Sequence, residues 1–291
     1  MKVAIHGKEF STDSEQIVRD LLLKLKLKET TLYISDKFQK ILNLKGIVVE
    51  NSQVFSYQNP YEQADAMITL GGDGTLLDAV TYIGDKQTPI LGINTGRLGF
   101  LATTAKDAID KALDQLFEKN YTYDDRTMLC LKSNKSLFND KTYALNDFTI
   151  LKKDSSSMIV VRTFINGEFL NAYWADGLIV SSPTGSTGYS LSCGGPLVLP
   201  QSKNFVITPV SPHNLTARPI VVDDDSEISF KIEGRNDSFL ISLDSRVESI
   251  DSSVKLSIVK ETFCTRLIKL PFDNYFDTLR QKLNWGIDIR N

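Results

Sequence analysis

The pattern of apolar residues changes near residue 122, and this change constrains the fold more than any other feature of the chain. Before it, short apolar runs at residues 3–5, 66–70 and 89–93 alternate with stretches of helical period, which is typical of an α/β domain with a mostly parallel sheet. From about residue 128 to residue 270, short β-prone runs separated by turn residues predict an all-β domain.

Two local patterns refine this division of the chain. Asn166-Gly167 lies between two β-prone runs and predicts a tight hairpin, because both residues tolerate positive φ. Residues 275–283 have the apolar pattern of a helix that is too short to fold alone. We therefore expect three parts, which are an α/β domain at 1–122, an all-β domain at 123–270, and a C-terminal segment at 271–291 that packs back on the first domain.

Composition and charge argue against several classes of function. The chain carries 33 basic and 36 acidic residues, so it has no overall positive field to attract nucleic acid. No apolar stretch approaches the length that spans a bilayer, and the first residues predict a strand instead of a signal sequence. Cys130, Cys193 and Cys264 fit no metal or disulfide spacing, and we expect them to be buried in a cytoplasmic protein.

Residues 71–75, Gly-Gly-Asp-Gly-Thr, place one carboxylate among glycines where an apolar strand is expected to turn into a helix. We expect Thr75 to cap that helix. Glycines let a charged ligand approach the main chain, and a helix start favours anions. The Asp73 carboxylate would repel a phosphate unless it binds a metal or accepts a proton, and phosphoryl transfer requires both roles. The alternative is an Asp-Gly turn without function.

Two better-known phosphate motifs are absent from this region. Residues 72–77 lack the last glycine of the dinucleotide-binding fingerprint, and no glycine run in the chain is followed by Lys-Ser or Lys-Thr. A nucleotide would therefore be held in another way.

Three further segments carry polar groups near the ends of expected strands. Residues 92–101 contain glycines after an apolar strand, which suggests a crevice shared with the glycine-rich motif at the carboxyl edge of the sheet. Residues 176–192 offer many hydroxyl groups to a polar ligand, and Tyr189 offers a ring for stacking. Asn146-Asp147 suits sugar hydroxyls. The alternative for each segment is a connecting loop or turn.

Five motifs together resemble the NAD kinase family in their order and spacing. They are GGDGT at 71–75, NTGRLGFL at 94–101, ND at 146–147, DGLIVSSPTGSTGYSLSCGGP at 176–196 and SPHNLTARPIV at 211–221. GGDGT alone is shared with diacylglycerol and sphingosine kinases and, more loosely, with phosphofructokinases, whereas the last two motifs are much more specific. The resemblance implies a doubly wound α/β domain, a C-terminal NAD-binding β-sandwich and a homo-oligomer, often a tetramer.

The resemblance also implies a reaction and a set of site residues. The γ-phosphoryl group of ATP would pass to the 2'-hydroxyl of the adenosine ribose of NAD, with Asp73 as general base and Mg²⁺ as the divalent metal. The products would be NADP and ADP. The residues implied to bind these nucleotides are Gly72, Gly74, Thr75, Asn94, Asn146, Asp147, Asp176, Thr187, Gly188, Tyr189, Ser190, Leu191, Ser192 and His213.

Some positions depart from the family pattern or leave a choice open. The usual Asn-Glu pair is Asn146-Asp147 here, which keeps the charge but shortens its reach. Arg246 stands where many members have glutamine, and it would add a cation if it entered the site. His213 is either a site residue or a structural histidine, whereas we expect His6 to be structural.

Two other functions compete with this one. A lipid kinase on the same two-domain plan would need an apolar surface for an acyl chain, which the hydroxyl-rich residues 176–192 do not suggest. A non-enzymatic nucleotide sensor would keep its ligand response after Asp73→Asn, whereas a kinase would lose turnover and retain NAD binding.

Overall fold

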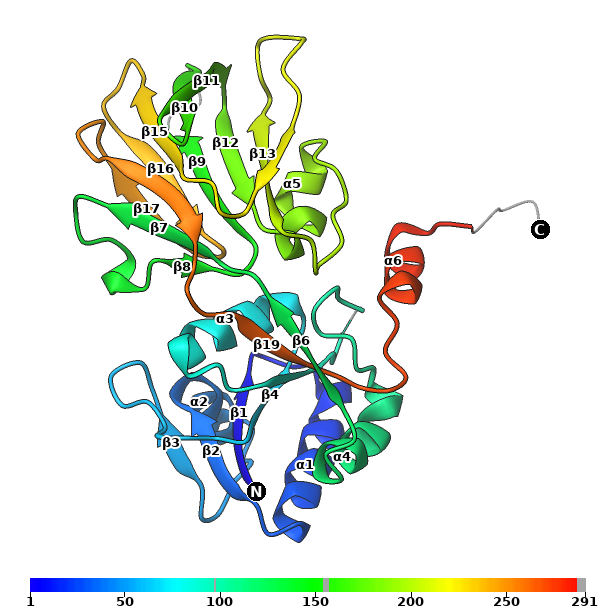
Figure 1. Ribbon diagram of the computed structural model, residues 1–291. Coiled ribbons are helices and arrows are strands. Elements are labelled where there is room, and N and C mark those ends of the chain that lie inside the picture. The colour runs from blue at the N-terminus through cyan, green and yellow to red at the C-terminus, as the bar shows by residue number, and fades with distance from the viewer. Residues whose placement is uncertain (97, 154–156, 287–291) are drawn as a thin grey trace. The chain divides into compact units, whose positions relative to one another are not determined.

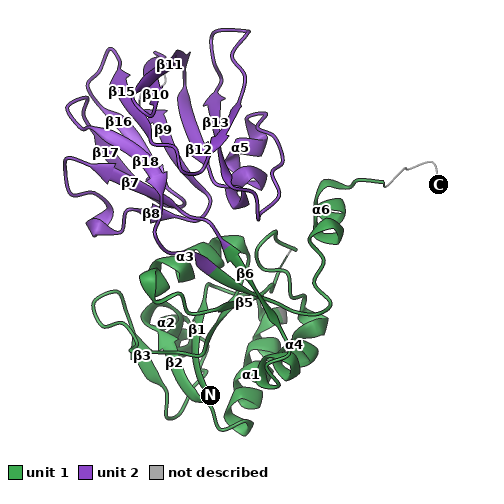
Figure 2. Cartoon of the chain, in the orientation of Figure 1, with its two compact units in different colours: residues 1–125, 266–291 green, residues 126–265 purple. Residues whose placement is uncertain are grey.

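The structure, a computed structural model, describes residues 1–96, 98–153 and 157–286 (Figure 1). The chain forms two compact units (Figure 2). Unit 1 comprises Met1–Asp125 and Arg266–Asn291, and unit 2 comprises Arg126–Thr265. The predicted fold class, an α/β domain followed by an all-β domain, is confirmed.

Unit 1 is built on a sheet that has seven strands among the described residues, in the order β3-β2-β1-β4-β5-β19-β6. Adjacent strands from β3 to β19 are parallel. The strands are β1 (Lys2–Gly7), β2 (Thr31–Ser35), β3 (Gln53–Phe55), β4 (Ala66–Leu70), β5 (Ile90–Ile93), β6 (Thr122–Arg126) and β19 (Thr265–Lys269). Because β19 follows unit 2 in the sequence, the chain returns to the first sheet near its end.

Helices cover both faces of this sheet. They are α1 (Thr12–Leu27), α2 (Asp36–Leu44), α3 (Asp73–Ile83) and α4 (Ile109–Phe117), with short 3₁₀ turns η1 (Gly84–Lys86) and η2 (Lys106–Ala108). Helix α6 (Tyr275–Leu283) follows the last strand of the sheet, β19. Apolar residues of α1, α2 and α4 share a buried cluster with alternate strand residues such as Val3 and Ile5. The opposite face meets α3, where the rings of His6 and Tyr82 are 5.1 Å apart. The unit is therefore doubly wound.

Unit 2 is a β-sandwich of two antiparallel sheets around one core (Figure 1). One sheet has the order β11-β10-β15-β18-β7-β8 and the other the order β14-β13-β12-β9-β16-β17. The strands are β7 (Leu129–Ser133), β8 (Tyr143–Ala144), β9 (Asp147–Lys152), β10 (Ile159–Ile165), β11 (Glu168–Ala175), β12 (Gly177–Ser181), β13 (Asn204–Val210), β14 (Ile220–Asp223), β15 (Ile228–Glu233), β16 (Phe239–Leu243), β17 (Arg246–Ile250) and β18 (Leu256–Lys260). Short helical turns are η3 (Phe138–Asp140), η4 (Thr184–Thr187) and α5 (Tyr189–Ser192).

The predicted hairpin is confirmed. Ile165 pairs with Glu168, so Asn166 and Gly167 form the two-residue turn between β10 and β11. Both turn residues have positive φ, 52° and 84°, as the favoured hairpin turns require.

Two sequence-based expectations were wrong in detail. Helix α3 begins at Asp73 with Gly72 as its N-cap, so Thr75 lies inside the first turn, buried, and does not cap the helix. The cysteines are partly exposed instead of buried. Helix α6 spans the predicted residues 275–283, with Leu279 buried and Phe276 52% exposed.

Candidate functional site

The strand order of unit 1 reverses between β1 and β4, and the carboxyl ends of these two strands lie side by side. Gly7 pairs with Leu70 in the parallel register, and the Lys8 N–H donates to the Leu70 carbonyl. In open α/β sheets, ligands bind outside the carboxyl ends of strands at such a reversal. The glycine-rich residues 71–75 follow β4 at this point.

The first residue of the glycine-rich turn, Gly71, has no room for a side chain. Gly71 has φ 153°, and a Cβ added there would come within 2.1 Å of the Thr75 hydroxyl oxygen. In contrast, a Cβ on Gly72 would meet no atom within 4 Å, so this side of the helix start is open. The turn thus presents exposed backbone at the N-terminus of an 11-residue helix, where anions are favoured.

The Asp73 carboxylate accepts three backbone hydrogen bonds from the segment that follows β5. Phe100 N–H donates to Oδ2 at 2.8 Å, and the N–H groups of Leu101 and Ala102 each donate to Oδ1 at 3.0 Å. Gly99 makes this approach possible, because a Cβ there would lie 1.9 Å from Oδ1. The two glycine-bearing segments predicted to share a crevice are therefore joined through Asp73.

Asn94 stabilises the same segment after β5 through hydrogen bonds to its backbone. Its amide oxygen accepts the Gly96 N–H at 2.7 Å, and its amide nitrogen donates to the Ala102 carbonyl. These contacts shape the loop, and the predicted contact of Asn94 with a nucleotide stays a prediction. Arg97, in the middle of the motif, lies outside the described residues.

Lys8 is a candidate that the sequence did not single out. Its ammonium group lies 2.9 Å from the Asp78 carboxylate and 3.2 Å from the Gly74 carbonyl oxygen. A cation at the N-terminus of a helix opposes the helix dipole. The only sequence signal for this residue was a lysine directly after the first strand.

His6 is fully buried beside this region. Its Nδ1 is 2.7 Å from the Ser35 hydroxyl, and among the described residues its Nε2 has no hydrogen-bond partner. Burial lowers the pKa of the imidazole to about 4 because the charged form loses its hydration. His6 is therefore neutral at pH 7 and packs against α3.

In unit 2, Asn146 and Asp147 lie at the start of β9, directly below the turn η4. A Cβ on Gly185 would come within 2.0 Å of the Asn146 carbonyl oxygen, and a Cβ on Gly188 would lie 3.8 Å from both the Asn146 amide and the Asp147 carboxylate. The predicted residues Asn146, Asp147 and Gly188 are therefore brought together, although more than 40 residues separate them in sequence.

Asp147 is 8% exposed, and its pKa is raised to about 7. The largest cause is burial, which disfavours the charged carboxylate, and the second is the charge of Asp244. The Asn146 amide oxygen is also buried, and within the described parts of the chain it has no hydrogen-bond partner. Such polar groups are the ones to which a ligand with hydroxyl groups could donate.

Asp176 lies at the other end of β12 from Asp147. In the sheet, Ser181 at the end of β12 pairs with Asp147, whereas Asp176 precedes the first residue of β12 and forms an ion pair with Lys152 at 2.6 Å. Burial raises the pKa of Tyr189, and the charges of both Asp176 and Asp147 add to that effect. The half-exposed Tyr189 ring therefore stands within electrostatic reach of both carboxylates.

The hydroxyl groups predicted to bind ligand have mostly protein partners. The Ser190 hydroxyl is 2.8 Å from that of Thr208, and the Thr187 hydroxyl donates to the Thr184 carbonyl. In the same short helix, Leu191 is partly buried and Ser192 is exposed. These contacts fold the turn tightly, so that Gly188 and Tyr189 are the residues it presents beside Asp147.

His213 is exposed near the Asp176 end of β12. Its backbone N–H donates to the Trp174 carbonyl at 2.8 Å, two residues before Asp176. The structure thus leaves the predicted choice between a site histidine and a structural one open.

Sequence reasoning missed one further residue beside this site. Asp244 is partly buried, and its carboxylate accepts the N–H groups of Leu145, Asn146 and Asp147. No local pattern links residues about one hundred positions apart, so only the pairing of β9 with β16 reveals the contact.

Comparisons with known proteins cover both units. The family model described as ATP-NAD kinase N-terminal domain matches residues 6–121, and the one described as ATP-NAD kinase C-terminal domain matches residues 145–270. The chain is 51% identical to the NAD kinase of Cytophaga hutchinsonii and 43% identical to that of Flavobacterium johnsoniae, over the full length of all three chains. Its fold is similar to that of yeast NADH kinase complexed with NADH, with TM-score 0.88 and 24% identity over 100% of this chain and 89% of the other.

Proposed function

The chain belongs to the NAD kinase family, and on that premise we propose which of its residues carry out phosphoryl transfer from ATP to NAD. The reaction joins the γ-phosphoryl group to the 2'-hydroxyl of the adenosine ribose and releases NADP and ADP. Its transition state needs little covalent chemistry from a protein, so catalysis depends on positioning, charge stabilisation and acceptance of the hydroxyl proton.

Asp73 is the proposed general base, and its hydrogen bonding is the observation that carries the proposal. A carboxylate offers about four acceptor positions, and the amides of residues 100–102 take three of those on Asp73. The amides therefore fix the orientation of the carboxylate, while one position on Oδ2 is left for the 2'-hydroxyl proton. A base in this role must lie within hydrogen-bond reach of the proton that it accepts.

The phosphates of ATP are proposed to lie against Gly72, Gly74 and Thr75 at the start of α3. The backbone is open at Gly72, and the helix dipole favours negative charge there. Lys8 would move its ammonium from Asp78 to a phosphate oxygen, since the N-terminus of a helix is an unfavourable place for an unaccompanied cation. Asn94 is proposed to keep the neighbouring loop in shape through its bonds to Gly96 and Ala102.

Mg²⁺ is proposed to enter with ATP. Within the described ranges, no group of three or more His, Cys, Asp or Glu side chains could hold a metal ion by itself. Mg²⁺ is usually bound by one or two carboxylates together with substrate phosphates. In α3, Asp73 lies in the first turn and Asp78 lies in the middle of the helix. Bound there, the ion would offset charge on the transferring phosphoryl group.

NAD is proposed to bind along β12 in unit 2. Asn146 and Asp147 would accept hydrogen bonds from ribose hydroxyls, and Tyr189 would stack on a ring of the ligand. Asp176 would bind the far end of the dinucleotide, beside His213. Thr187, Gly188, Ser190, Leu191 and Ser192 are proposed to form the wall of the site.

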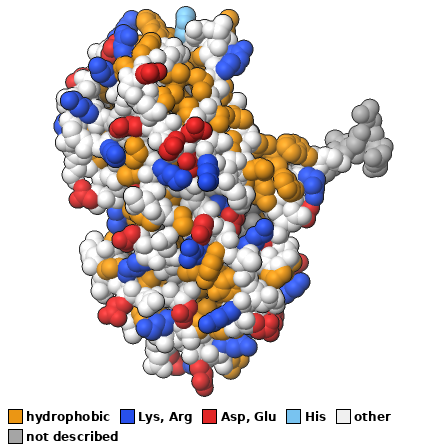
Figure 3. All heavy atoms as spheres, in the orientation of Figure 1, with side chains coloured by type: hydrophobic (Ala, Val, Ile, Leu, Met, Phe, Trp, Pro, Cys, Tyr) orange, Lys and Arg blue, Asp and Glu red, His pale blue; other side chains and the backbone are white. Residues whose placement is uncertain are grey.

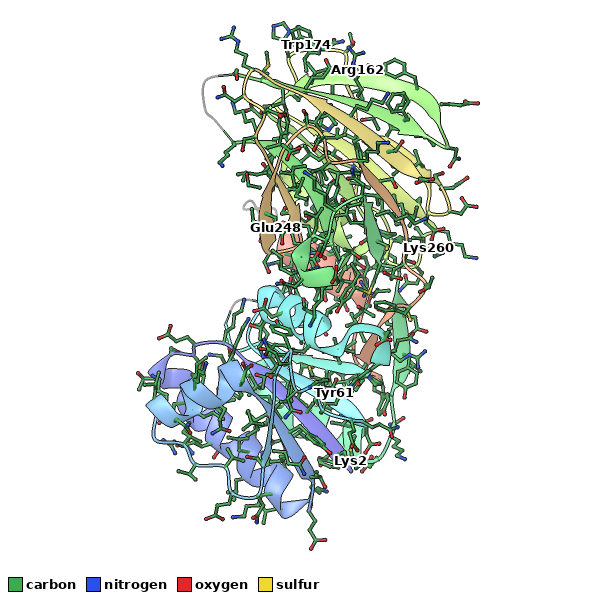
Figure 4. All side chains as sticks on the ribbon, turned by 90° about the vertical axis from the view of Figure 1, so that its left-hand side faces the viewer. Lys2, Tyr61, Arg162, Trp174, Glu248 and Lys260 are labelled. Atoms are coloured by element: carbon green, nitrogen blue, oxygen red, sulfur yellow. The ribbon has the colours of Figure 1, made fainter. Side chains whose placement is uncertain are left out.

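We also propose a homo-oligomer in the cytoplasm. Strand β11 lies at the edge of its sheet and carries Phe169 and Trp174, which are 58% and 57% exposed. Trp174 is labelled in Figure 4. Exposed aromatic side chains on an edge strand favour association with another chain. Sedimentation velocity would test the assembly.

Figure 3 shows acidic and basic side chains interspersed over the visible face of both units. Among the described residues, no helix is both long and apolar enough to cross a membrane.

The direct test is to incubate the protein with NAD, ATP and Mg²⁺ and to detect NADP with an NADP-specific dehydrogenase. We expect NADP to accumulate with the wild-type chain and not with Asp73→Asn, which should still bind NAD. Phosphate appearing on diacylglycerol, with no NADP, would instead support the lipid-kinase alternative, for which the relatives give no support. Unchanged ligand response without any turnover would support a sensor.

A further inference from the structure

Three side chains of the β16–β17 hairpin hold the main chain of residues 138–147 in unit 2. They are Asp244, in the turn of the hairpin, and Arg246 and Glu248, which occupy alternate positions of β17 and therefore share one face of that strand. Asp244 stands in the two-residue turn of the hairpin, since Leu243 pairs with Arg246.

Asp244 binds the end of this segment at four points. Its Oδ1 accepts the N–H groups of Asn146 at 2.7 Å and Asp147 at 3.2 Å, and its Oδ2 accepts that of Leu145 at 3.0 Å. Its own N–H donates to the Asp147 carbonyl at 3.0 Å. The φ of Asp244 is 52°, a left-handed value that few residues other than glycine adopt without cost. The turn keeps a carboxylate where glycine would be less strained.

Arg246 and Glu248 hold the earlier part of the same segment. The Arg246 guanidinium donates to the carbonyls of Lys141 and Tyr143, and it lies over the rings of Phe138 and Tyr143 at 5.8 and 5.6 Å. Glu248, labelled in Figure 4, accepts the Phe138 N–H at 2.7 Å. The positive charge of Arg246 thus interacts with backbone carbonyl groups and also lies close enough to Asp244 to act on its carboxylate.

The opposite side of the segment is held by the turn before η4. The Ser182 hydroxyl donates to the Leu145 carbonyl, and the Ser182 N–H donates to the Asn146 carbonyl at 2.9 Å. Asp244 therefore holds the N–H groups of residues 145–147 and the Asp147 carbonyl, while Ser182 holds the carbonyls of Leu145 and Asn146. Their side chains, Asn146 and Asp147, point to the polar site beside Gly188.

We infer that Asp244 and Arg246 are positioning residues for NAD, which hold the main chain that carries Asn146 and Asp147. This inference rests on the proposed binding of NAD by Asn146 and Asp147. Asp244 does not touch the substrate in this account. It acts through the residues whose main chain it holds.

Electrostatics give this arrangement a measurable signature. The Asp147 pKa is raised to about 7 by burial and then by Asp244. Burial also raises the pKa of Asp244, but three N–H donors and the Arg246 charge oppose that rise. Tyr189 of α5 is a further titratable group near Asp147, and its raised pKa keeps it neutral. Asp244 therefore ionises first, and Asp147 binds the proton between them.

The experiment compares Asp244→Asn with the wild-type chain in NAD, ATP and Mg²⁺ between pH 5 and 9. The variant should raise KM for NAD roughly tenfold, as expected for the loss of one buried charge-assisted hydrogen bond, with little change in KM for ATP. For the wild type, kcat/KM for NAD should fall below about pH 7, where Asp147 is protonated. In the variant the midpoint of this fall should move down by about one pH unit, because the neighbouring charge is gone.

Arg246→Gln is the second variant, in case Asp244→Asn does not fold. It removes the charge on the carbonyls of Lys141 and Tyr143 and should raise KM for NAD by several-fold, on the scale of one hydrogen bond. Arg162→Gln is the matched control, because Arg162 is an exposed residue of the same unit whose ion pair with Glu233 is remote from this segment. It should leave KM for NAD unchanged.

The outcomes separate this inference from the proposed NAD site. If Asp147→Asn leaves KM for NAD unchanged, the proposed site is wrong and the inference falls with it. If Asp147→Asn raises KM for NAD but a folded Asp244→Asn keeps the wild-type KM and pH midpoint, the inference alone is overturned. A lower melting temperature with an unmoved midpoint and an unchanged KM would make Asp244 purely structural, which also overturns it.

Discussion

Asp73 in unit 1 and Asp147 in unit 2 are both aspartates beside the end of a strand, but they meet the backbone differently. Three backbone N–H groups bind the Asp73 carboxylate directly. In unit 2 the backbone N–H groups of residues 145–147 bind a neighbouring carboxylate, that of Asp244, instead of Asp147. Asp147 itself is buried next to that second carboxylate. The same residue type is therefore fixed as an oriented acceptor in one unit and kept as a proton-binding group in the other.

Asp73→Asn tests the first half of this comparison and should have the largest effect. Loss of a general base costs about 10²–10⁴-fold in turnover, and the amide would also turn an N–H group toward the donors of residues 100–102. NADP formation measured with an NADP-specific dehydrogenase should fall by that factor. Asp85→Asn, in the exposed 3₁₀ turn after the same helix, is the control that should retain activity.

Gly99→Ala tests whether the oriented carboxylate requires the close approach of the loop. A Cβ at Gly99 would lie 1.9 Å from Asp73 Oδ1, so the loop or the carboxylate must move, and misplacement by about 1 Å costs on the order of 10²-fold in rate. The matched control is Gly96→Ala in the same loop, where the nearest atom would be 3.9 Å away. If both variants had wild-type kcat, the contact between Gly99 and Asp73 would have no role in turnover.

Lys8→Met tests the phosphate side of unit 1. Loss of an exposed cation that pairs with phosphate should raise KM for ATP by about tenfold and leave KM for NAD nearly unchanged. Lys2→Met is the control, because Lys2 lies at the amino end of the same strand (Figure 4). Steady-state kinetics with ATP as the varied substrate would measure the effect, and equal KM values for both variants would remove Lys8 from the site.

Asp147→Asn tests the second half of the comparison through stability. The folded-state pKa of about 7 exceeds the ordinary value of 3.8, so the native state holds a proton that the unfolded state has lost between these pH values. The stability of the wild type therefore falls as pH rises through this window, by up to roughly 4 kcal/mol. The Asp147→Asn variant has no ionisable group at this position, so its stability does not fall with pH for this reason. Its melting temperature should exceed that of the wild type at pH 8, and the difference should shrink toward pH 4.5.

The same melting experiment includes its own control. Asp237→Asn, at an exposed carboxylate in the same unit, should show no such pH-dependent gain. A wild-type chain and Asp147→Asn that melt together at pH 8 would mean that Asp147 is not held in an environment that disfavours its charge.

Sequence patterns predicted the fold class because period and turn chemistry are local. Residues 275–283 and the Asn166-Gly167 hairpin were found from their own side chains and appear in the structure at those positions. The start of α3 was missed by three residues, since Gly72 caps the helix through its backbone conformation and leaves no side-chain signal. The exposure of Phe276 depends on which residues from the rest of the chain pack against the helix, and the sequence of the helix alone does not specify them.

The candidate site was only partly predictable for a different reason. Asp73 and Asn146-Asp147 could be named because their motifs are contiguous. Their partners are not, since Asp73 meets residues 27 to 29 positions away and Asp244 meets residues 97 to 99 positions away. Arg246 illustrates the limit, because the sequence left its role open, and the structure shows that it binds the carbonyls of Lys141 and Tyr143. Such contacts follow from strand pairing, which one sequence does not reveal.

The central claim is that Asp73 acts on the transferring proton, whereas Asp147 acts on binding of the acceptor. Steady-state kinetics of Asp73→Asn and Asp147→Asn at pH 8, with NAD as the varied substrate, test it most directly. The account predicts that Asp73→Asn loses kcat with KM for NAD nearly unchanged, and that Asp147→Asn raises KM for NAD with a smaller loss of kcat. The opposite division, with kcat lost mainly in Asp147→Asn, would contradict it.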